Sequence, residues 1–261
     1  MADKLQGTTV LVTGGAGGLG KVIATAFLNE GANVVVCDIN EERLKAVREE
    51  SESTGRFLAI NTDITDEAAV NKLVDTAVAK FGRLDIVVSN AGMTDKFDAV
   101  GSLSKENWDK VINLNLTGSF LIFKAAVNVM EKQSPQGGTI IQIGSTAGWY
   151  GTAAGAAYTV SKHGVAALVK NTAGFYESKN IYAIGLNVGA MIDTNIQDGF
   201  RSLGGFNKET FALSISSTLD PQKQAIRLKD VAKYCIFLAD RDIAATSSGS
   251  TITFNKNTPK Q

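Results

Sequence analysis

A glycine-rich stretch near the amino terminus constrains the fold more than any other feature of the sequence. Residues 9–13 form a short β-branched run, and the cluster GGAGGLG follows at once at residues 14–20. Residues 21–28 then carry an apolar stripe at helical spacing, which stops near Gly31. A buried strand, a sharp turn and a helix place backbone N–H groups and a helix N-terminus where a phosphate can bind. This start predicts a nucleotide-binding α/β sheet.

Two kinds of phosphate site fit the glycine cluster. Gly15 to Lys21 spells GxxxxGK, close to the loop that binds nucleoside triphosphates, but Val22 stands where magnesium requires a Ser or Thr hydroxyl. A dinucleotide site fits better, because a second strand at residues 33–37 ends in Asp38, whose carboxylate can accept hydrogen bonds from an adenosine ribose. That carboxylate repels a 2′-phosphate, and no Arg or Lys follows it directly. The sequence therefore favours NAD (NADH) as the cofactor, with NADP less favoured.

The remainder of the chain alternates short apolar runs with amphipathic helical patterns. We predict further strands at residues 57–60, 84–89, 139–143, 181–187 and 251–254, and helices at 41–52, 67–81, 105–130 and 230–239. A Gly-, Ser- and Phe-containing region at about 190–218 is expected to form a substrate lid. This pattern predicts the α/β class: a doubly wound parallel sheet of about seven strands, Rossmann-like, with helices on both faces. We expect a single domain over residues 1–261.

A Ser, a Tyr and a Lys form the strongest candidate for chemistry. Ser145 follows a predicted strand at its carboxyl end, where doubly wound sheets bind ligands. Tyr158 and Lys162 are four residues apart, so they share one face of a helix. A charge on Lys162 near the Tyr158 hydroxyl favours the phenolate and would lower the pKa of the phenol from about 10. Such a phenol can exchange a proton with a substrate oxygen.

Composition excludes several other classes. Lys+Arg and Asp+Glu both count 26, so no net charge attracts nucleic acid or an anionic membrane. The single histidine, His163, argues against Ser-His-Asp triads and histidine metal sites. Cys37 and Cys235 are interpreted as buried thiols in a reducing compartment, and neither has metal-ligand spacing. No apolar run approaches the ~18 residues of a membrane span. We therefore expect a cytoplasmic protein without a metal.

Together these motifs resemble the short-chain dehydrogenase/reductase (SDR) family, from about residue 7 to residue 253. The matching positions of the glycine turn, the acidic contacts and the Asn-Ala-Gly motif are Thr13, Gly14, Gly18, Gly20, Asp38, Asp63, Asn90, Ala91 and Gly92. The resemblance implies a catalytic tetrad of Asn115, Ser145, Tyr158 and Lys162. It implies cofactor contacts at Gly14, Gly18, Leu19, Gly20, Asp38, Asp63, Ile64, Asn90, Ala91, Gly92, Tyr158, Lys162, Gly189, Ile192 and Thr194.

The resemblance also implies a reaction and an assembly. The protein would be an NAD(H)-dependent oxidoreductase that interconverts a secondary alcohol and a ketone, with Tyr158 as general acid or base. Ser145 would orient the substrate oxygen, Lys162 would contact the nicotinamide ribose, and Asn115 would hold a water. The resemblance implies that the protein forms a homo-oligomer, either a tetramer or a dimer. A catalytically silent or non-redox dinucleotide-binding protein of the same fold remains the alternative.

Two segments bear on the substrate and the cofactor. Residues 187–194 read NVGAMIDT, without the Pro-Gly that the family has after its sixth strand. The substrate pocket is expected to be apolar and aromatic, lined by Met93, Thr146, Trp149, Tyr150, Phe200, Phe206 and Phe211. Such a lining favours a small molecule that is hydrophobic or contains a ring. The same aromatic residues could instead belong to the core or to a subunit interface.

Overall fold

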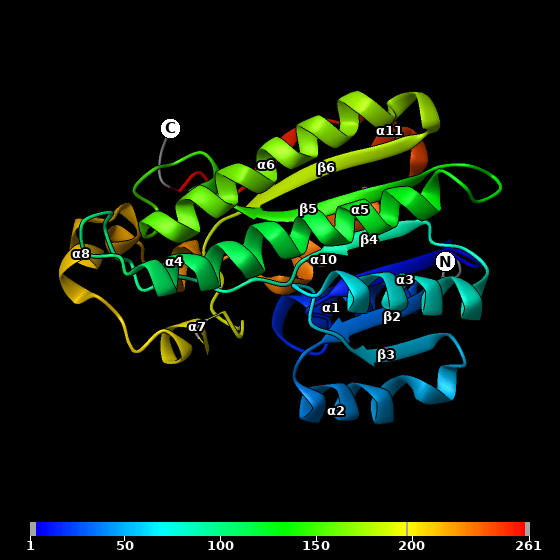
Figure 1. The fold of residues 1–261 in the computed structure, drawn as a ribbon, viewed down its shortest axis with the longest axis horizontal. Coiled ribbons are helices and arrows are strands. Elements are labelled where there is room, and N and C mark those ends of the chain that lie inside the picture. Colours follow the sequence, from blue (N-terminus) through cyan, green and yellow to red (C-terminus); the bar gives the residue numbers. More distant parts are fainter. Residues whose placement is uncertain (1–3, 197, 259–261) are drawn as a thin grey trace.

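A parallel sheet forms the centre of the molecule in the computed structural model, which describes residues 4–196 and 198–258 (Figure 1). Its strands are β1 (Thr9–Thr13), β2 (Asn33–Asp38), β3 (Phe57–Asn61), β4 (Ile86–Ser89), β5 (Gly138–Ser145), β6 (Ile181–Val188) and β7 (Thr251–Phe254). The order is β3-β2-β1-β4-β5-β6-β7 and every pairing is parallel. The predicted fold class is confirmed. The strand order reverses direction between β1 and β4, where sheets of this kind bind ligands.

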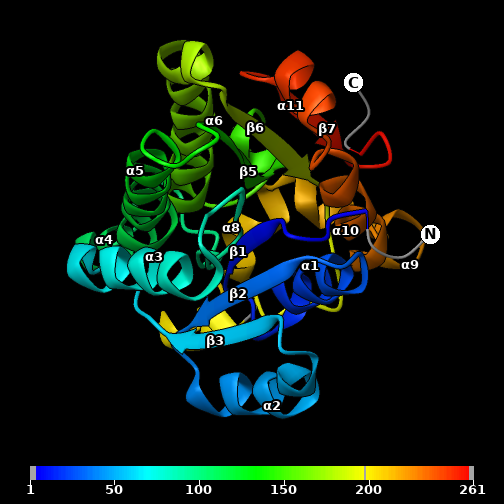
Figure 2. The same ribbon diagram turned by 90° about the vertical axis from the view of Figure 1, so that its right-hand side faces the viewer.

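Helices cover both faces of the sheet (Figure 2). The longer ones are α1 (Gly18–Asn29), α2 (Glu41–Ser51), α3 (Glu67–Phe81), α4 (Lys105–Ile112), α5 (Ser119–Met130), α6 (Ala156–Tyr176), α10 (Leu228–Phe237) and α11 (Arg241–Ser247). Three short helices, α7 (Asp198–Ser202), α8 (Lys208–Leu213) and α9 (Pro221–Gln224), lie in the segment between β6 and α10. Short 3-10 turns occur at Glu52–Thr54, Thr146–Gly148, Glu177–Lys179 and Ile215–Thr218.

The two faces of the sheet bury separate apolar layers. In β1, Val10 and Val12 point into a layer shared with α1, α2, α10 and α11, whereas Leu11 points into a layer shared with α3, α5 and α6. This alternation follows from the two-residue period of a strand. Cys37 and Cys235 are buried in opposite layers as free thiols, and burial raises the pKa of each to about 12. The predicted burial of both thiols is confirmed.

The predicted helix at residues 105–130 consists of three parts. α4 and α5 are joined by a π-helical turn, Asn113–Gly118, so the stretch Lys105–Met130 is continuous. Within the described residues it is long and apolar enough, by length and composition, to cross a membrane, which the sequence analysis did not expect. More than half of its apolar window is buried inside the protein, and core helices of soluble proteins pass the same test. The helix therefore gives only weak support for a membrane span.

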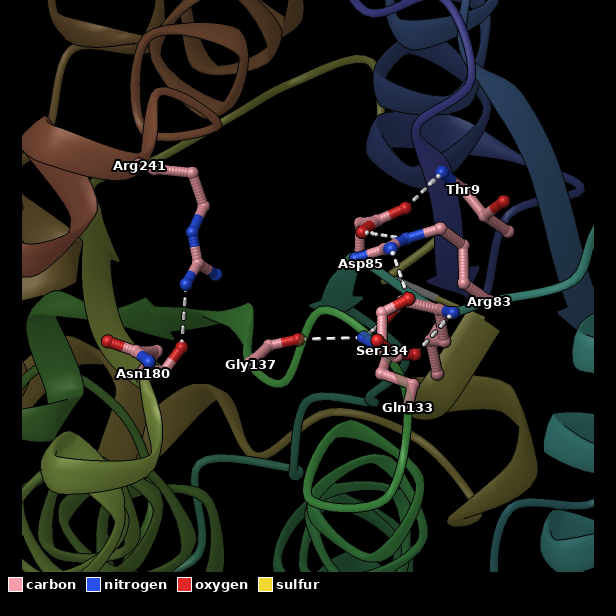
Figure 3. A network of polar contacts seen from close by, with 9 residues as sticks. Thr9, Arg83, Asp85, Gln133, Ser134, Gly137, Asn180 and Arg241 are labelled. Carbon is pink, nitrogen blue, oxygen red and sulfur yellow. Dashed lines mark hydrogen bonds and ion pairs between the residues drawn. The ribbon is translucent and has the colours of Figure 1, made fainter.

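The amino ends of the strands are joined by a network of polar contacts (Figure 3). Asp85, just before β4, accepts hydrogen bonds from the Thr9 backbone N–H at 2.9 Å and from the Arg83 Nε at 2.6 Å. The Gln133 amide donates to the Gly137 carbonyl at 2.7 Å, and the Arg241 guanidinium donates to the Asn180 carbonyl at 2.8 Å. These contacts pair backbone groups at or just before the starts of β1, β5 and β6.

Candidate functional site

A cleft of about 430 Å³ opens at the carboxyl ends of β1, β2, β4 and β5. Most of the predicted cofactor residues line it: Gly14, Gly18, Leu19, Asp38, Asp63, Ile64, Asn90, Ala91, Gly92, Tyr158, Lys162 and Thr194. On the other side the cleft is bounded by Met191, Asn195 and the start of α7. The structure thus brings together, at the carboxyl ends of the strands, residues spread along the chain from Gly14 to Ser202.

Three of the predicted cofactor residues lie outside this cleft. Gly20 packs inside the glycine turn, where an added Cβ would come within 2.1 Å of the Gly14 carbonyl oxygen. Gly189 lies against Asn255, and the side chain of Ile192 is exposed at a separate hollow beside Val22. Gly20 therefore shapes the site from behind, while Gly189 and Ile192 do not reach it. Gly189 donates its N–H to the Phe254 carbonyl of the last strand, whereas Met191 and Thr194 of the same segment line the cleft.

The glycine turn leaves backbone donors free at the start of α1. Gly14 and Gly18 have φ values of +63° and +47°, in the left-handed region that favours glycine. Gly17 precedes the helix and no side chain caps the first turn. The turn is fixed to the segment after β4 because the Thr13 Oγ1 accepts hydrogen bonds from the backbone N–H groups of Asn90 and Ala91, each at 2.9 Å. A phosphate group fits such a helix start.

Asp38 lies at the end of β2, where it was expected. Its Oδ1 accepts a hydrogen bond from the Asn40 backbone N–H at 3.0 Å. Arg43 from α2 lines the same part of the cleft, and its guanidinium donates to the Asp198 carboxylate of α7 at 2.7 Å. Arg43 was not predicted from the sequence, because helical periodicity shows which face a residue occupies but not which distant segment that face meets.

The three candidate catalytic residues lie close together beside the cleft, which Tyr158 and Lys162 line. Ser145 is the last residue of β5, and its hydroxyl lies close enough to the phenol of Tyr158 from α6 to lower the pKa of that phenol. The Lys162 Nζ lies 5.4 Å from the centroid of the Tyr158 ring and donates to the Ile143 carbonyl oxygen at 3.2 Å. Tyr158 and Lys162 are 8% and 5% exposed, so both polar groups are desolvated. Burial is therefore the largest influence on the pKa values of the Tyr158 phenol and the Lys162 amine.

Burial moves the pKa values of these two groups in opposite directions. It raises the pKa of Tyr158 to about 12, although the hydrogen bond with Ser145 lowers it, and the nearby Asp95 carboxylate raises it further. Burial also lowers the pKa of Lys162 to about 8. The prediction that Lys162 lowers the pKa of the phenol is wrong for the protein alone. Desolvation of the phenolate outweighs the lysine charge, whose ammonium group is directed to the Ile143 carbonyl.

Asn115 lies behind the cleft, in the π-helical turn between α4 and α5. Its side-chain amide pairs with both backbone groups of Met93: the Oδ1 accepts from the N–H and the Nδ2 donates to the carbonyl, each at 2.9 Å. The Ser119 hydroxyl donates to the Asn115 carbonyl at 2.8 Å. Asn115 is 1% exposed and fixes the segment after Gly92, so its position in the structure is that of a support for the cleft wall.

The segment between β6 and α10 lies beyond the carboxyl ends of the strands, in yellow and orange (Figure 1). Phe200, Phe206 and Phe211 gather around Phe97, with ring centroids 4.9–6.3 Å from it. Phe97 has a φ of +65°, which is uncommon for a residue other than glycine. Of the expected pocket residues, Met93 lines the cleft, whereas these three phenylalanines form a cluster that attaches the segment to the loop after β4.

The remaining expected pocket residues also pack among themselves. Trp149 and Tyr150 contact each other edge to face at 5.3 Å, and Tyr150 packs against the apolar cluster that includes Tyr158. Thr146 begins the 3-10 turn that follows Ser145. Tyr150 thus packs near Tyr158, and Thr146, Trp149 and Tyr150 are not among the residues that line the dinucleotide cleft.

The residues present fit a dinucleotide. The uncapped start of α1 would hold the diphosphate, Asp38 the adenosine ribose, and the region of Tyr158 and Lys162 the nicotinamide half. An added Cβ on Gly17 would come within 2.7 Å of the Asn195 Oδ1, so the Asn195 side chain lies against the glycine turn. Within the described residues, no group of three His, Cys, Asp or Glu side chains could hold one metal ion.

Comparison with known proteins agrees with this geometry. The sequence model of the short chain dehydrogenases matches residues 8–202. The chain is 41% identical over 249 residues to a short chain dehydrogenase/reductase of Colletotrichum higginsianum, covering 95% of this chain and 92% of that protein. It is 35% identical over 198 residues to 3beta-hydroxysteroid dehydrogenase 2 of Eggerthella lenta, covering 76% and 75%. The chain belongs to the short-chain dehydrogenase/reductase family, as the sequence analysis predicted.

Two solved structures extend the comparison to the whole fold. Levodione reductase superposes with a TM-score of 0.84 at 26% identity, over 98% of each chain. A 3-ketoacyl-(acyl-carrier-protein) reductase from Brucella melitensis, complexed with NADH, superposes with a TM-score of 0.82 at 26% identity, over 97% of this chain and 98% of that one. The protein is thus a dehydrogenase/reductase that acts on CH–OH groups, within a family that uses NAD(P).

Proposed function

We propose that the protein is an NAD(H)-dependent oxidoreductase that interconverts a secondary alcohol and a ketone on a hydrophobic or ring-containing small molecule. The observation that carries this proposal is the buried Tyr158 phenol at the cleft, with the Lys162 amine 5.4 Å from the centroid of its ring and the Ser145 hydroxyl close enough to affect its pKa. A bound nicotinamide supplies or accepts the hydride. The chain's own residues then have to bind the substrate oxygen and move its proton.

Tyr158 is the proton donor in the direction of ketone reduction. Because burial raises its pKa to about 12, the phenol is protonated at neutral pH and can donate to a substrate oxygen that gains negative charge. The Ser145 hydroxyl, close to the phenol, orients that oxygen and stabilises its charge. Lys162 would contact the cofactor ribose and, as an amine with a pKa of about 8, can pass on a proton at physiological pH.

The choice of NAD over NADP rests on the charges around Asp38. Its carboxylate lines the adenosine end of the cleft and would repel a 2′-phosphate. Arg43 is the basic group nearest to this end among the lining residues, and its guanidinium is paired with Asp198. The related reductase from Brucella melitensis was solved with NADH. Fluorescence titration of NADH and NADPH tests the preference, and equal or tighter binding of NADPH would exclude it.

An apolar substrate is supported by the walls near Tyr158. Met93, Met191 and Ile196 line the cleft, and Tyr150, in edge-to-face contact with Trp149, packs against the apolar cluster that contains Tyr158. Two of the similar proteins are a levodione reductase and a 3beta-hydroxysteroid dehydrogenase. The test is NADH oxidation over a panel of cyclic and linear ketones and small sugars. Turnover should be fastest with cyclic ketones, and a preference for sugars would contradict this proposal.

We also propose that the protein is a cytoplasmic homo-oligomer. Three large apolar side chains on neighbouring helices are exposed: Phe120 on α5, and Val160 and Phe175 on α6, at 46%, 45% and 73%. Exposed apolar residues on adjacent helices are typical of a subunit interface. Light scattering coupled to size-exclusion chromatography should give the mass of a dimer or a tetramer, and a monomeric mass would contradict the proposal.

A further inference from the structure

The helix that carries Tyr158 and Lys162 has no cap of its own. α6 begins at Ala156, and the residue before it is Gly155, which offers no side-chain acceptor for the free backbone N–H groups of the first turn. Unpaired N–H groups at a helix start are costly when they are buried. An acceptor from elsewhere in the chain is therefore needed at this end of α6.

Asp95 supplies that acceptor from the loop after β4. Its Oδ2 accepts a hydrogen bond from the Tyr158 backbone N–H at 2.9 Å, and its Oδ1 accepts one from the Gly155 backbone N–H at 3.1 Å. The Oδ1 also accepts from the Phe97 backbone N–H at 3.0 Å, so one carboxylate joins both segments. An added Cβ on Gly155 would come within 2.6 Å of both carboxylate oxygens, which explains the glycine at this position.

The charge on Asp95 is balanced mainly by the helix. Asp95 is 1% exposed, and within the described residues no Lys, Arg or His forms an ion pair with it. Burial raises the pKa of this carboxyl, and the neighbouring Asp98 raises it further, while the three backbone N–H groups lower it. A carboxylate at a helix N-terminus is stabilised by the backbone dipoles. The Asp95 carboxylate thus lies at the first turn of α6, where it contacts the backbone N–H of the proton donor Tyr158.

We infer that Asp95 is the positioning residue of the catalytic helix, and that its carboxylate fixes the first turn of α6, and hence the Tyr158 phenol, relative to Ser145. This inference rests on the proposed role of Tyr158. It goes further because it assigns a role to a residue of the β4–α4 loop that touches neither substrate nor cofactor. A second effect is electrostatic, since the Asp95 charge raises the pKa of the phenol and keeps it protonated.

The main test is Asp95→Asn. This change keeps the size of the side chain but replaces one acceptor oxygen by an NH2 group, which cannot accept from the Tyr158 N–H. Ketone reduction should slow by about 10-fold to 10²-fold, as for a misplaced catalytic group. The affinity for NADH should change less than about 2-fold, because the glycine turn and Asp38 are untouched.

The pH profile separates positioning from mere stabilisation. Without the Asp95 charge the pKa of Tyr158 falls, so the alkaline loss of ketone reduction should begin at lower pH than in the native protein. The groups that face the phenol are Ser145 from β5 and Lys162 from α6, and both remain. Lys162, with a pKa of about 8, titrates in both proteins and so does not mimic the shift.

Asp240→Asn is the matched control. Asp240 caps α11 by accepting from the backbone N–H groups of Asp242 and Ile243 at 3.0 and 3.2 Å, next to Arg241, which contacts the Asn180 carbonyl just before β6. Its substitution should leave the turnover number and the pH profile unchanged. If Asp95→Asn also kept both, or lost activity only in proportion to its unfolded fraction with an unshifted profile, the inference would be overturned.

Two further variants keep the test decisive. If Asp95→Asn does not fold, Gly155→Ala is measured in its place, because the added Cβ pushes the carboxylate away while its charge is kept. Gly155→Ala should lower the turnover number without weakening NADH binding. Native turnover in this variant would overturn the inference. Tyr158→Phe is measured in parallel. Should Tyr158→Phe retain native turnover, the proposed function itself fails, whereas loss of activity in Tyr158→Phe with native behaviour of Asp95→Asn refutes only the role of Asp95.

Discussion

The two ends of the same sheet are built in opposite ways. At the amino ends of the strands, polar groups are paired with one another, as in the contacts of Asp85, Gln133 and Arg241 (Figure 3). At the carboxyl ends, backbone N–H groups at the start of α1 carry no cap, and two buried groups, Tyr158 and Lys162, have shifted pKa values. Satisfied polar groups stabilise the fold, whereas donors and titratable groups left available can serve a ligand.

The difference predicts that substitutions at the two ends have separable effects. Substitutions at the carboxyl end should change the activity, and substitutions at the amino end should change the stability.

The largest effect is expected for Tyr158→Phe, which removes the phenol hydroxyl but keeps the ring packing. The turnover number should fall by about 10²-fold or more, the usual scale for a lost general acid or base. Steady-state kinetics and thermal unfolding check this together, and a turnover close to that of the native protein would make the Tyr158 assignment wrong.

Lys162→Met should stabilise the fold while it harms the site. The unfolded chain holds a proton on this amine up to about pH 10.5, whereas the folded protein releases it near pH 8. Burial of the charge therefore costs stability fully below pH 8, and the cost fades as the pH rises toward 10.5. The shift corresponds to about 3 kcal/mol, and the lost hydrogen bond to the Ile143 carbonyl offsets about 1 kcal/mol of the gain.

Urea unfolding of Lys162→Met and the native protein measures this gain. The free energy of unfolding of the variant should exceed that of the native protein by about 2 kcal/mol near pH 7, with a smaller difference near pH 10. A difference that grew with pH would have the wrong sign and would show that Lys162 is not held against its charged form. Such a result would remove the contrast between the two ends of the sheet.

The smallest effect is expected at the amino end. Asp85→Ala removes the acceptor of the Thr9 N–H and the partner of Arg83, which lies 27% exposed beside a carboxylate that is 20% exposed. Because both groups keep some contact with water, the free energy of unfolding should fall by only about 1–2 kcal/mol. Activity per folded molecule and NADH affinity should be unchanged, and a loss of turnover without a loss of stability would contradict the division between the two ends.

Local patterns in the sequence predicted most of the fold and the position of the catalytic residues. The β-branched run before the glycine cluster is β1, and Ser145 lies at the carboxyl end of a strand as expected. Tyr158 and Lys162 share a helix face because their spacing determines it. These features depend on neighbours in sequence, so they can be read without a three-dimensional structure.

Features that depend on distant segments were missed or misjudged. The Asp95 carboxylate reaches a helix start 60 residues further along the chain, and the Arg43 guanidinium reaches Asp198 across the cleft. The direction of the Tyr158 pKa shift depends on burial by several elements at once, which spacing alone cannot give. The phenylalanines expected in the pocket instead meet Phe97, whose φ of +65° no sequence pattern indicates.

The π-helical turn at Asn113–Gly118 makes the number of residues in this helix a geometric requirement of the site. A π turn holds one residue more than an α turn, so it shifts the phase between the helix before it and the helix after it. Deleting one residue there would restore α geometry and rotate one side of the helix by about 100° relative to the other. Either Asn115 would leave the Met93 backbone, or α5 would turn its apolar side chains away from the sheet. A change in length at this turn should therefore be more damaging than a change in the identity of its exposed side chains.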